Sequence, residues 1–263
     1  MQEGIYIAAS GAFKQEKNLN VIANNLANLG NAAFKRDGLV FEEKTSSFRA
    51  LLNFTETEPS IFNQERPKKG ASYVGVASFY SDHSQGPLKK TGNTLDLAIE
   101  GDGYFAIQTP AGERYTRNGN FILDAEGFLA TQMGNRLLGP KGEPIQIDTQ
   151  GGAITIDSKG FISVGSGLEN QPAGQINLVV IEDKSNLIKE GNALYKITGG
   201  ATDKEGAKNI SVRQGFLELS NVNSVEEMTK MITTLRAFEA YQKVIQAIDG
   251  ADDLAVNSIG RIA

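Results

Sequence analysis

The chain of 263 residues contains no cysteine and no tryptophan, and it has a single histidine. Without cysteine there is no disulfide framework, no thiolate metal site and no cysteine nucleophile. Without tryptophan, a common platform for stacking sugar rings is also missing. The chain is nevertheless long enough to build one or two domains around a sizeable hydrophobic core.

Long apolar runs and an excess of basic charge are also missing. No stretch approaches the roughly 18–20 apolar residues of a membrane span, so we expect no direct membrane insertion. The net charge of −5 argues against nucleic acid as the main partner. We interpret the basic pairs Lys35-Arg36, Lys68-Lys69 and Lys89-Lys90 as solvated loop charges. The N-terminus lacks the basic start and continuous apolar stretch of a secretory signal, so any export should occur without a cleaved leader.

Motifs that carry chemistry are scarce. His83 lies in the short polar run 81–86, where neighbouring residues cannot converge as a nucleophile, a base and an orienting acid; we expect an exposed loop histidine. No stretch has the alternating oxygen ligands of an EF-hand loop, and phosphate-loop and dinucleotide fingerprints are absent. The sequence therefore predicts no catalytic residue, no cofactor and no metal site. A hydrolase with paired carboxylates stays open only because carboxylate geometry cannot be seen in a sequence.

The N-terminal residues follow the periodicity of an amphipathic helix. Ile5, Ala12, Leu19 and Leu26 recur every seven residues, and the second seam position is filled by Ala8, Ile22 and Leu29, with an interruption at Gln15. The opposite side carries polar residues: Lys14, Lys17, Asn18, Asn24, Asn25 and Asn28. This pattern predicts a helix with one packed face and one wet face.

A second amphipathic helix is predicted at the C-terminus. Its apolar stripe is Val225, Met228, Ile232, Leu235, Phe238, Tyr241, Ile245 and Ile248. Ser224 followed by Glu226 and Glu227 provides a cap and acidic residues at the positive end of the helix dipole. Each stripe is too narrow to offset the entropy of ordering the helix alone. We therefore expect the terminal helices to be mobile in a free monomer and to become ordered on assembly.

The asparagines at positions 24, 25 and 28 need an explanation, because asparagine is a mediocre helix former. One interpretation is a helix that frays toward its end near Gly30. The other is that the amides bond to adjacent helices and fix the packing register, as a buried asparagine does in coiled coils.

The middle of the chain differs from both ends. Residues 30 to about 80 contain scattered Gly, Pro and Phe residues with little periodicity, which favours a long loop or extended arm. From Thr94 to about Leu219, short apolar or alternating runs are separated by glycine turns, which predicts antiparallel β structure. A glycine directly precedes an aromatic residue at 103–104, 127–128, 160–161 and 215–216.

These observations predict an α+β fold with three parts. N- and C-terminal α-helices, residues 1–30 and 221–263, pair as a coiled-coil layer and form a helical assembly domain. Residues 31–80 form the extended arm, and residues 81–220 form a central antiparallel β-rich domain.

Three ordered blocks carry a resemblance to a known family. The run Val21-Ile22-Ala23-Asn24-Asn25-Leu26-Ala27-Asn28 is followed by Phe34-Lys35-Arg36; the other blocks are Thr91 to Ile99 with Tyr115 to Gly119, and Ser220 to Met228. Together they resemble the bacterial flagellar basal-body rod and hook proteins, and the ending after Tyr241 is more similar to the proximal-rod branch than to the distal-rod branch. One departure is the segment 30–33, Gly-Asn-Ala-Ala, where the family usually has Thr and then Gly before the Phe.

The resemblance implies a structural subunit without enzymatic activity, exported through the flagellar type III apparatus and assembled helically into the rod in the periplasm. Its partners would be further copies of itself and other rod proteins. A secreted β-rich binding module is the alternative from another class. We expect the assembly contacts to come from the two helices: Ile5, Ala12, Leu19, Ile22, Asn24, Asn25, Leu26, Asn28, Val225, Met228, Met231, Leu235, Phe238, Tyr241 and Ile245.

Overall fold

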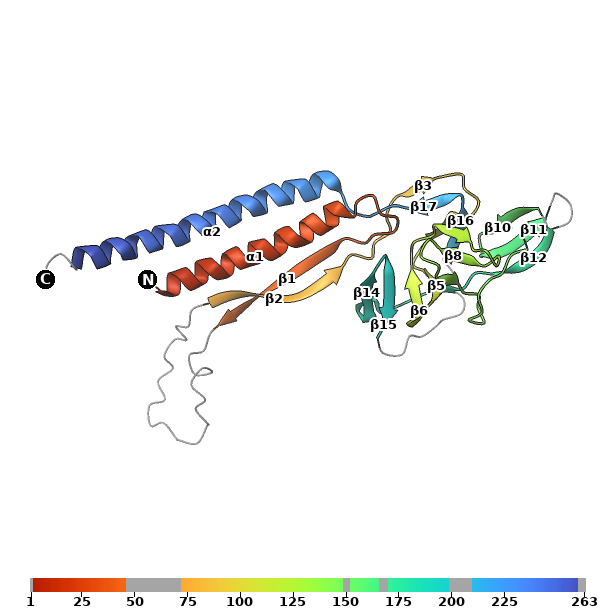
Figure 1. The fold of residues 1–263 in the computed structure, drawn as a ribbon, viewed down its shortest axis with the longest axis horizontal. Coiled ribbons are helices and arrows are strands. Elements are labelled where there is room, and N and C mark those ends of the chain that lie inside the picture. Colours follow the sequence, from red (N-terminus) through yellow and green to blue (C-terminus); the bar gives the residue numbers. More distant parts are fainter. Residues whose placement is uncertain (1, 46–71, 149–151, 166–169, 199–209, 260–263) are drawn as a thin grey trace, which may run out of the picture. The chain divides into compact units, whose positions relative to one another are not determined.

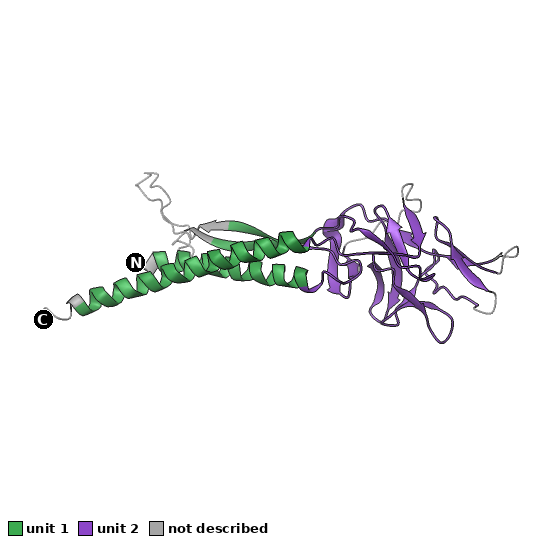
Figure 2. Cartoon of the chain, turned by 90° about the horizontal axis from the view of Figure 1, so that it is seen from above, with its two compact units in different colours: residues 1–26, 37–81, 224–263 green, residues 27–36, 82–223 purple. Residues whose placement is uncertain are grey.

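The computed structural model describes residues 2–45, 72–148, 152–165, 170–198 and 210–259. The chain divides into two compact units (Figure 2). Unit 1 comprises residues 1–26, 37–81 and 224–263, and unit 2 comprises residues 27–36 and 82–223. Each unit is therefore assembled from segments that are far apart in the sequence.

Unit 1 contains both predicted helices. Helix α1 spans Gln2–Ala27 and helix α2 spans Ser224–Ile259, and they lie side by side with opposite chain directions (Figure 1). The predicted start at Ser224 is confirmed, with Glu226 and Glu227 in the first turn of α2. Negative side chains there are favoured by the positive end of the helix dipole.

The two helices contact each other at heptad intervals. Asn25 faces Glu227 and Asn18 faces Thr234 through hydrogen bonds of 3.3 and 3.2 Å from each Nδ2 to the partner oxygen. Seven residues from Asn18 and Thr234, Gly11 of α1 lies against the Tyr241 ring of α2. Seven residues beyond these, toward the N-terminus of α1 and the C-terminus of α2, Gly4 lies against Ile248. A side chain at Gly11 would collide with the ring, so this glycine, which costs about 1 kcal/mol of helix propensity relative to alanine, leaves room for an aromatic residue.

A two-stranded antiparallel ribbon completes unit 1. Strand β1, Asp37–Thr45, pairs with β2, Ser72–Ser81, with a register shift between Val40 and Phe41. The ribbon meets α1 where the Lys14 ammonium lies 4.7 Å from the centre of the Phe41 ring. A loop prediction is wrong for these two stretches, because their residues pair as strands despite poor periodicity. Three of the Phe residues scattered through the predicted arm, Phe48, Phe54 and Phe62, lie outside the described residues.

Unit 2 is built from short antiparallel strands and confirms the predicted β-rich region. The strands are β3 Leu88–Lys90, β4 Leu97–Glu100, β5 Tyr104–Thr109, β6 Gly112–Thr116, β7 Phe121–Leu123, β8 Leu129–Thr131, β9 Arg136–Leu137, β10 Ala153–Ile156, β11 Phe161–Gly165, β12 Asn170–Gln175, β13 Leu178–Val179, β14 Leu187–Gly191, β15 Leu194–Ile197, β16 Ser211–Gln214 and β17 Phe216–Glu218. A 3₁₀ turn covers Lys184–Asn186.

The strands of unit 2 are grouped in several small sheets. The largest follows the order β14-β15-β6-β5-β9-β8-β7, with β13 also paired to β5, and a second sheet has the order β10-β11-β12. Two further pairs join distant parts of the chain, because β4 pairs with β16 and β3 pairs with β17. The last strands of the unit therefore complete the first ones.

Two hairpins in unit 2 use the same turn. In Asp124-Ala-Glu-Gly127-Phe128 and in Asp157-Ser-Lys-Gly160-Phe161, the Asp Oδ1 accepts hydrogen bonds from the backbone N–H groups two and four residues later. The glycines have φ of +80° and +79°, a conformation that other residues rarely adopt. The predicted glycine turns are confirmed here. Strands β5, β11 and β17 begin at the aromatic residue that follows a glycine, whereas β8 begins one residue later.

The core of unit 2 is apolar and consists of two clusters. The larger one gathers buried residues from β4, β5, β7, β8, β9, β10, β11 and β16, with the Phe105 and Phe121 rings edge to face at 5.2 Å between centroids. The smaller one contains Tyr104, Tyr115 and Tyr195. Each fully buried large side chain contributes roughly 1.5–3 kcal/mol, so these clusters stabilise the unit most.

A cluster of three charged side chains is fully buried in unit 2, and one of its members corrects the sequence interpretation. Lys35 is fully buried, as are Glu218 and Arg117. The Glu218 carboxylate pairs with Lys35 Nζ at 2.5 Å and with Arg117 Nη1 at 3.2 Å. Lys35 is therefore not a solvated loop charge, because its partner lies far away in the sequence. Lys89 and Lys90 are exposed as expected, but they lie in strand β3 and not in a loop. Lys68-Lys69 lies outside the described residues.

His83 is also not the exposed loop residue that the sequence suggested. Its ring lies 5.4 Å from the Tyr195 ring between centroids, and its Nδ1 is 3.1 Å from the Tyr104 hydroxyl. Burial lowers the pKa of His83 to about 4, and the positive charges of Lys184, Lys35 and Arg117 act in the same direction. The imidazole is therefore neutral near pH 7.

We expect unit 2 to lose stability when the pH falls from about 6.5 to about 4. In this window the unfolded chain binds a proton on His83 that the folded chain does not, so unfolding is favoured by up to roughly 3 kcal/mol. His83→Phe keeps a ring in place and should remove this part of the pH dependence. Urea unfolding at several pH values measures the difference, and identical pH profiles for the two proteins would contradict the assignment.

We expect Gly11→Leu to destabilise unit 1 by about 1–3 kcal/mol, because the added side chain overlaps the Tyr241 ring in a packed interface. Combining it with Tyr241→Ala should recover part of the loss. Urea unfolding followed by helical circular dichroism measures both effects. Ala9→Leu, at an exposed position of the same helix, is the matched control and should change stability little.

Candidate assembly interface

Most residues of the predicted N-terminal seam lie on the packed side of α1. Ala8, Ala12 and Ile22 are buried, and Ile5, Leu19 and Leu26 are partly buried. Leu29 lies beyond the end of α1 and is exposed. The heptad pattern thus identifies part of the face of α1 that packs within unit 1. The expectation of a wet opposite side is wrong for Asn18 and Asn25, because their amides bond to α2.

Asn25 joins three elements of unit 1. Its Nδ2 donates to the Asp37 carbonyl at 2.9 Å and to Glu227 Oε2 at 3.3 Å, and its Oδ1 accepts from the Asp37 backbone N–H at 2.9 Å. The expected bond from an amide to the adjacent helix is therefore present at this residue, and a role in fixing the packing register stays a prediction. Asn24 is exposed, and Asn28 lies in the turn after α1, where its Oδ1 accepts from Asn31 Nδ2. The alternative of a helix end near these residues is therefore also correct, for Asn28.

Helix α2 presents two different apolar faces. Met231, Phe238, Tyr241 and Ile245 are partly buried on the side that carries the heptad contacts with α1. Val225, Met228, Ile232 and Leu235 are on another side, with exposed fractions of 72, 54, 53 and 45%. The sequence merged these two groups into one stripe, but the structure separates them. We name the four exposed residues the outer stripe.

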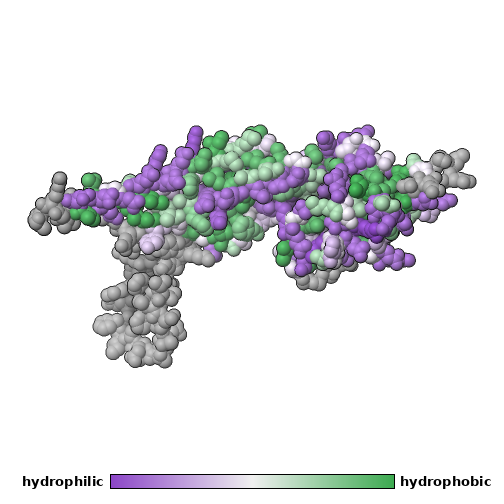
Figure 3. All heavy atoms as spheres, viewed as in Figure 1, coloured by the Kyte–Doolittle hydropathy of each residue, from purple (hydrophilic) through white to green (hydrophobic). Residues whose placement is uncertain are grey.

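Helix α1 has an exposed apolar group that the sequence interpretation missed. Tyr6, Ile7 and Phe13 are exposed on the side that was expected to be wet and polar, and the Lys17 ammonium lies 5.0 Å from the Phe13 ring centre. The seven-residue spacing of Tyr6 and Phe13 was a signal that could have revealed them. Figure 3 shows apolar atoms interleaved with polar atoms along the visible face of the helices.

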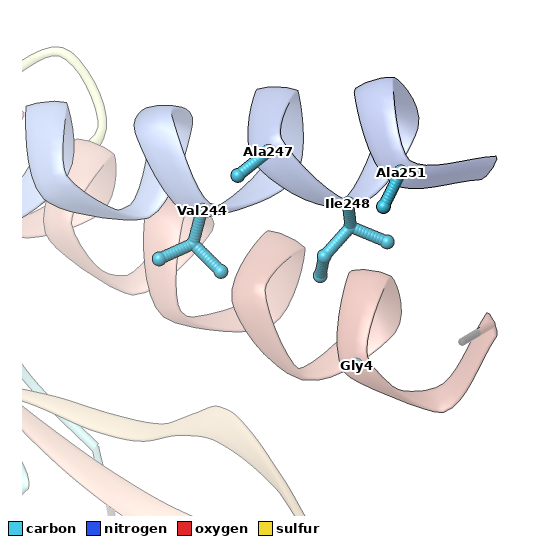
Figure 4. Close-up of a pocket in the computed structure, with 5 residues that line it drawn as sticks. All are labelled: Gly4, Val244, Ala247, Ile248 and Ala251. Atoms are coloured by element: carbon cyan, nitrogen blue, oxygen red, sulfur yellow. The ribbon is translucent and has the colours of Figure 1, made fainter. Parts of the chain in front are cut away.

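A shallow apolar groove lies where the N-terminal part of α1 meets the C-terminal part of α2. It is lined by Gly4 of α1 and by Val244, Ala247, Ile248 and Ala251 of α2, and has a volume of about 430 Å³. Figure 4 shows Val244 and Ile248 extending from α2 toward α1. Beyond it, Leu254 and Val256 of α2 are exposed. The groove has no charged or hydrogen-bonding side chain in its lining, so it offers no catalytic groups.

The described residues contain no group of three or more His, Asp or Glu side chains placed to hold a metal ion. Among these residues, none of the helices has an apolar stretch that could span a membrane. Exposed apolar side chains at this density on paired helices are typical of protein–protein contacts. Association through helix faces is therefore the chemistry that unit 1 supports best.

Comparisons with known proteins match the three parts of the chain in order. The family model for flagella basal body rod proteins matches residues 5–29, the model for the flagellar hook protein FlgE/F/G D1 domain matches residues 98–164, and the model for the C-terminal part of flagellar basal body rod FlgEFG proteins matches residues 213–258. The first and last matches fall on α1 and α2.

Relatives match over almost the whole length. The flagellar basal-body rod protein FlgF of Caulobacter vibrioides is 34% identical over 262 residues, covering 100% of both chains. FlgG of Bacillus subtilis is 34% identical over 95% of this chain and 96% of its own, and FlgF of Mesorhizobium japonicum is 30% identical over 99% of both. With its helix pair, its β-rich unit and these full-length relatives, the chain belongs to the flagellar basal-body rod protein family.

Proposed function

We propose that the chain is a structural subunit of the proximal flagellar rod that polymerises helically through its terminal helices and has no enzymatic activity. Full-length similarity to FlgF proteins supports the proximal position. A distal-rod or hook-type subunit is the alternative within the family, since a FlgG protein is equally identical at 34%. The observation that carries the proposal is the outer stripe, an apolar face of α2 that its own unit does not cover.

The helix pair would form one element of a coiled-coil layer. Four contacts recur every seven residues between α1 and α2, from Asn25 and Glu227 to Gly4 and Ile248. This is the spacing at which two helices keep the same faces together over many turns. In this proposal Ile5, Ala12 and Ile22 act within the subunit.

Contacts between subunits would come from the other predicted residues, Val225, Met228 and Leu235, together with Ile232 and the exposed aromatics of α1. The outer stripe and the group Tyr6, Ile7 and Phe13 are different surfaces. When unlike surfaces of identical chains pair head to tail without closing a ring, they form an open helical filament. Asn24, which is exposed beside these faces, would contribute a polar contact.

Magnitudes favour a cooperative polymer over a simple dimer. Covering four half-exposed side chains contributes on the order of 3–6 kcal/mol, whereas association costs an estimated 4–15 kcal/mol in lost freedom of motion. One such contact does not hold two chains together. Several contacts made at once by each subunit do, which suits a shaft that must carry torque.

The same proposal includes the route and place of assembly. We infer that the chain is exported through the flagellar type III apparatus and joins other rod proteins in the periplasm. The resemblance of its sequence blocks to the rod family supports this route. Residues 31–80 would contact neighbouring subunits through the β1–β2 ribbon, on which Val40, Phe79 and Tyr80 are exposed.

We expect Leu235→Asp to abolish rod assembly without unfolding the monomer. Leu235 is exposed in the single chain, so the carboxylate is solvated there, but burying it in an interface would cost several kcal/mol. Motility in soft agar and isolation of basal bodies from cells that rely on the variant measure assembly. Ala240→Asp adds the same charge at another exposed position of α2 and should assemble. Normal motility with Leu235→Asp would contradict the outer stripe as an interface.

We expect the amides of residues 3–28 to exchange quickly in dilute monomer and to become protected in the polymer. The intramolecular seam is narrow and the remaining apolar faces are covered only on assembly. Hydrogen exchange with mass spectrometry compares the two states, and the amides of β5 serve as an internal control because they lie in the core of unit 2. Strong protection of residues 3–28 in the monomer would show that the helices are ordered before assembly.

A further inference from the structure

The chain crosses between the two units at four points, at residues 26–27, 36–37, 81–82 and 223–224. On the side of unit 2, these crossings adjoin three short segments, 27–36, 82–87 and 218–223. Any force that passes between the units through the chain enters unit 2 at these segments. Their bonding to one another is therefore informative.

Glu218 binds all three segments together. Its Oε1 accepts a hydrogen bond from Lys35 Nζ at 2.5 Å and another from the Gly86 backbone N–H at 2.9 Å. Its backbone carbonyl accepts from the Ala33 N–H at 2.8 Å. The carboxylate is also paired with Arg117, which donates to the Gly101 carbonyl and so links the cluster to the loop before β5.

Asn221 provides a second set of ties between the same segments. Its Oδ1 accepts from the Arg36 backbone N–H at 2.8 Å, and its Nδ2 donates to the carbonyls of Asp82 at 2.8 Å and Ser84 at 3.2 Å. The Asp82 N–H in turn donates to the Arg36 carbonyl at 2.8 Å. Each segment is thus bonded to both of the others.

The strands next to these segments are too short to resist peeling. Strand β17 pairs only three residues with β3, and β16 pairs four residues with β4. A pull from one end of such a strand opens its hydrogen bonds one after another, at only about 0.5–1.5 kcal/mol each. The Glu218 ion pairs are different, because all of their partners are buried and exposing one charge leaves the others uncompensated.

We propose that Glu218 and Asn221 form a mechanical clamp that joins the three segments into one hydrogen-bonded cluster. Force that enters unit 2 by any crossing is then shared by all three segments. The proposal rests on the proposed function, because a rod subunit must transmit torque through its own chain. Burial lowers the pKa of Lys35, and the neighbouring Glu218 carboxylate acts in the opposite direction, in keeping with an ion pair that is shut off from water.

The clamp can be tested by pulling single molecules of the full-length chain. The sequence has no cysteine, so Val225→Cys and Met133→Cys, both at exposed positions, provide unique attachment points for optical tweezers. Force applied there reaches unit 2 through residues 218–224. For the otherwise unchanged protein we expect one cooperative rupture, in which the clamp and unit 2 open together.

Glu218→Gln should add an early lengthening step, with an opening rate at a given force at least roughly 100-fold higher, because removal of one partner of a buried ion pair is strongly destabilising. Glu190→Gln is the matched control. It breaks the Arg114–Glu190 pair of 2.6 Å in the same unit, which is partly exposed and does not touch the three segments, and it should leave the rupture unchanged.

Asn221→Ala is the second variant, in case Glu218→Gln does not fold. Asn221 is only partly buried, and removing its amide leaves no unpaired charge, so this variant is expected to fold. It should also produce an early step, with roughly a tenfold higher opening rate for the lost hydrogen bonds. Unchanged rupture in the variants that fold, or an equal effect of Glu190→Gln, would overturn the clamp. Either result leaves the assembly proposal intact, because that proposal is tested separately by Leu235→Asp in cells.

Discussion

The constraint behind this structure is that neither unit can be completed without both ends of the chain. Helix α1 has a seam that α2 covers, and the amide of Asn25 and the carboxylate of Glu227 meet only when residues 202 positions apart come together. In unit 2, β3 and β4 are paired by β17 and β16, and Lys35 is neutralised by Glu218. Long-range closure of this kind costs chain entropy, which the buried apolar clusters must offset.

The same closure separates two tasks. Unit 2 has its own apolar core and pairs its buried Lys35 and Arg117 with Glu218. It leaves a few large apolar side chains exposed, including Ile122, Met133, Phe161 and Ile188. Unit 1 is a thin assembly of two helices and a ribbon, and it leaves apolar side chains exposed on several sides. A two-stranded ribbon is marginal alone, and here it is supported by α1 through Phe41 and Asp37. The main apolar core therefore lies in unit 2, whereas most of the exposed large apolar side chains lie in unit 1.

Local patterns predicted the elements well and their partners less well. The seven-residue recurrence of Ile5, Ala12 and Leu19 found one packed side of α1, and glycine turns found the hairpins. The recurrence missed Asn18 and Asn25, which were expected on the wet side but bond to α2. Periodicity could not separate the two faces of α2, because Leu235 and Phe238 continue one another's spacing although only Phe238 lies on the seam side. Lys35 and His83 were misjudged since their surroundings come from residues distant in sequence. Ala33 has φ of +57°, a conformation that is uncommon for residues other than glycine, so the turn after α1 is held at the cost of some strain.

The ladder between α1 and α2 is graded along its length. Amide, hydroxyl and carboxylate groups meet at Asn25 and Asn18, whereas glycines face bulky rings and branched chains at the opposite extremity. At the first end the alignment is held by the direction of hydrogen bonds, whereas at the other end it is held by the close fit of a side chain against a glycine. The two ends of the helix pair are therefore matched by different kinds of contact. A polymer in which all such subunits point the same way would have polarity, and its two ends would not be chemically equivalent during growth.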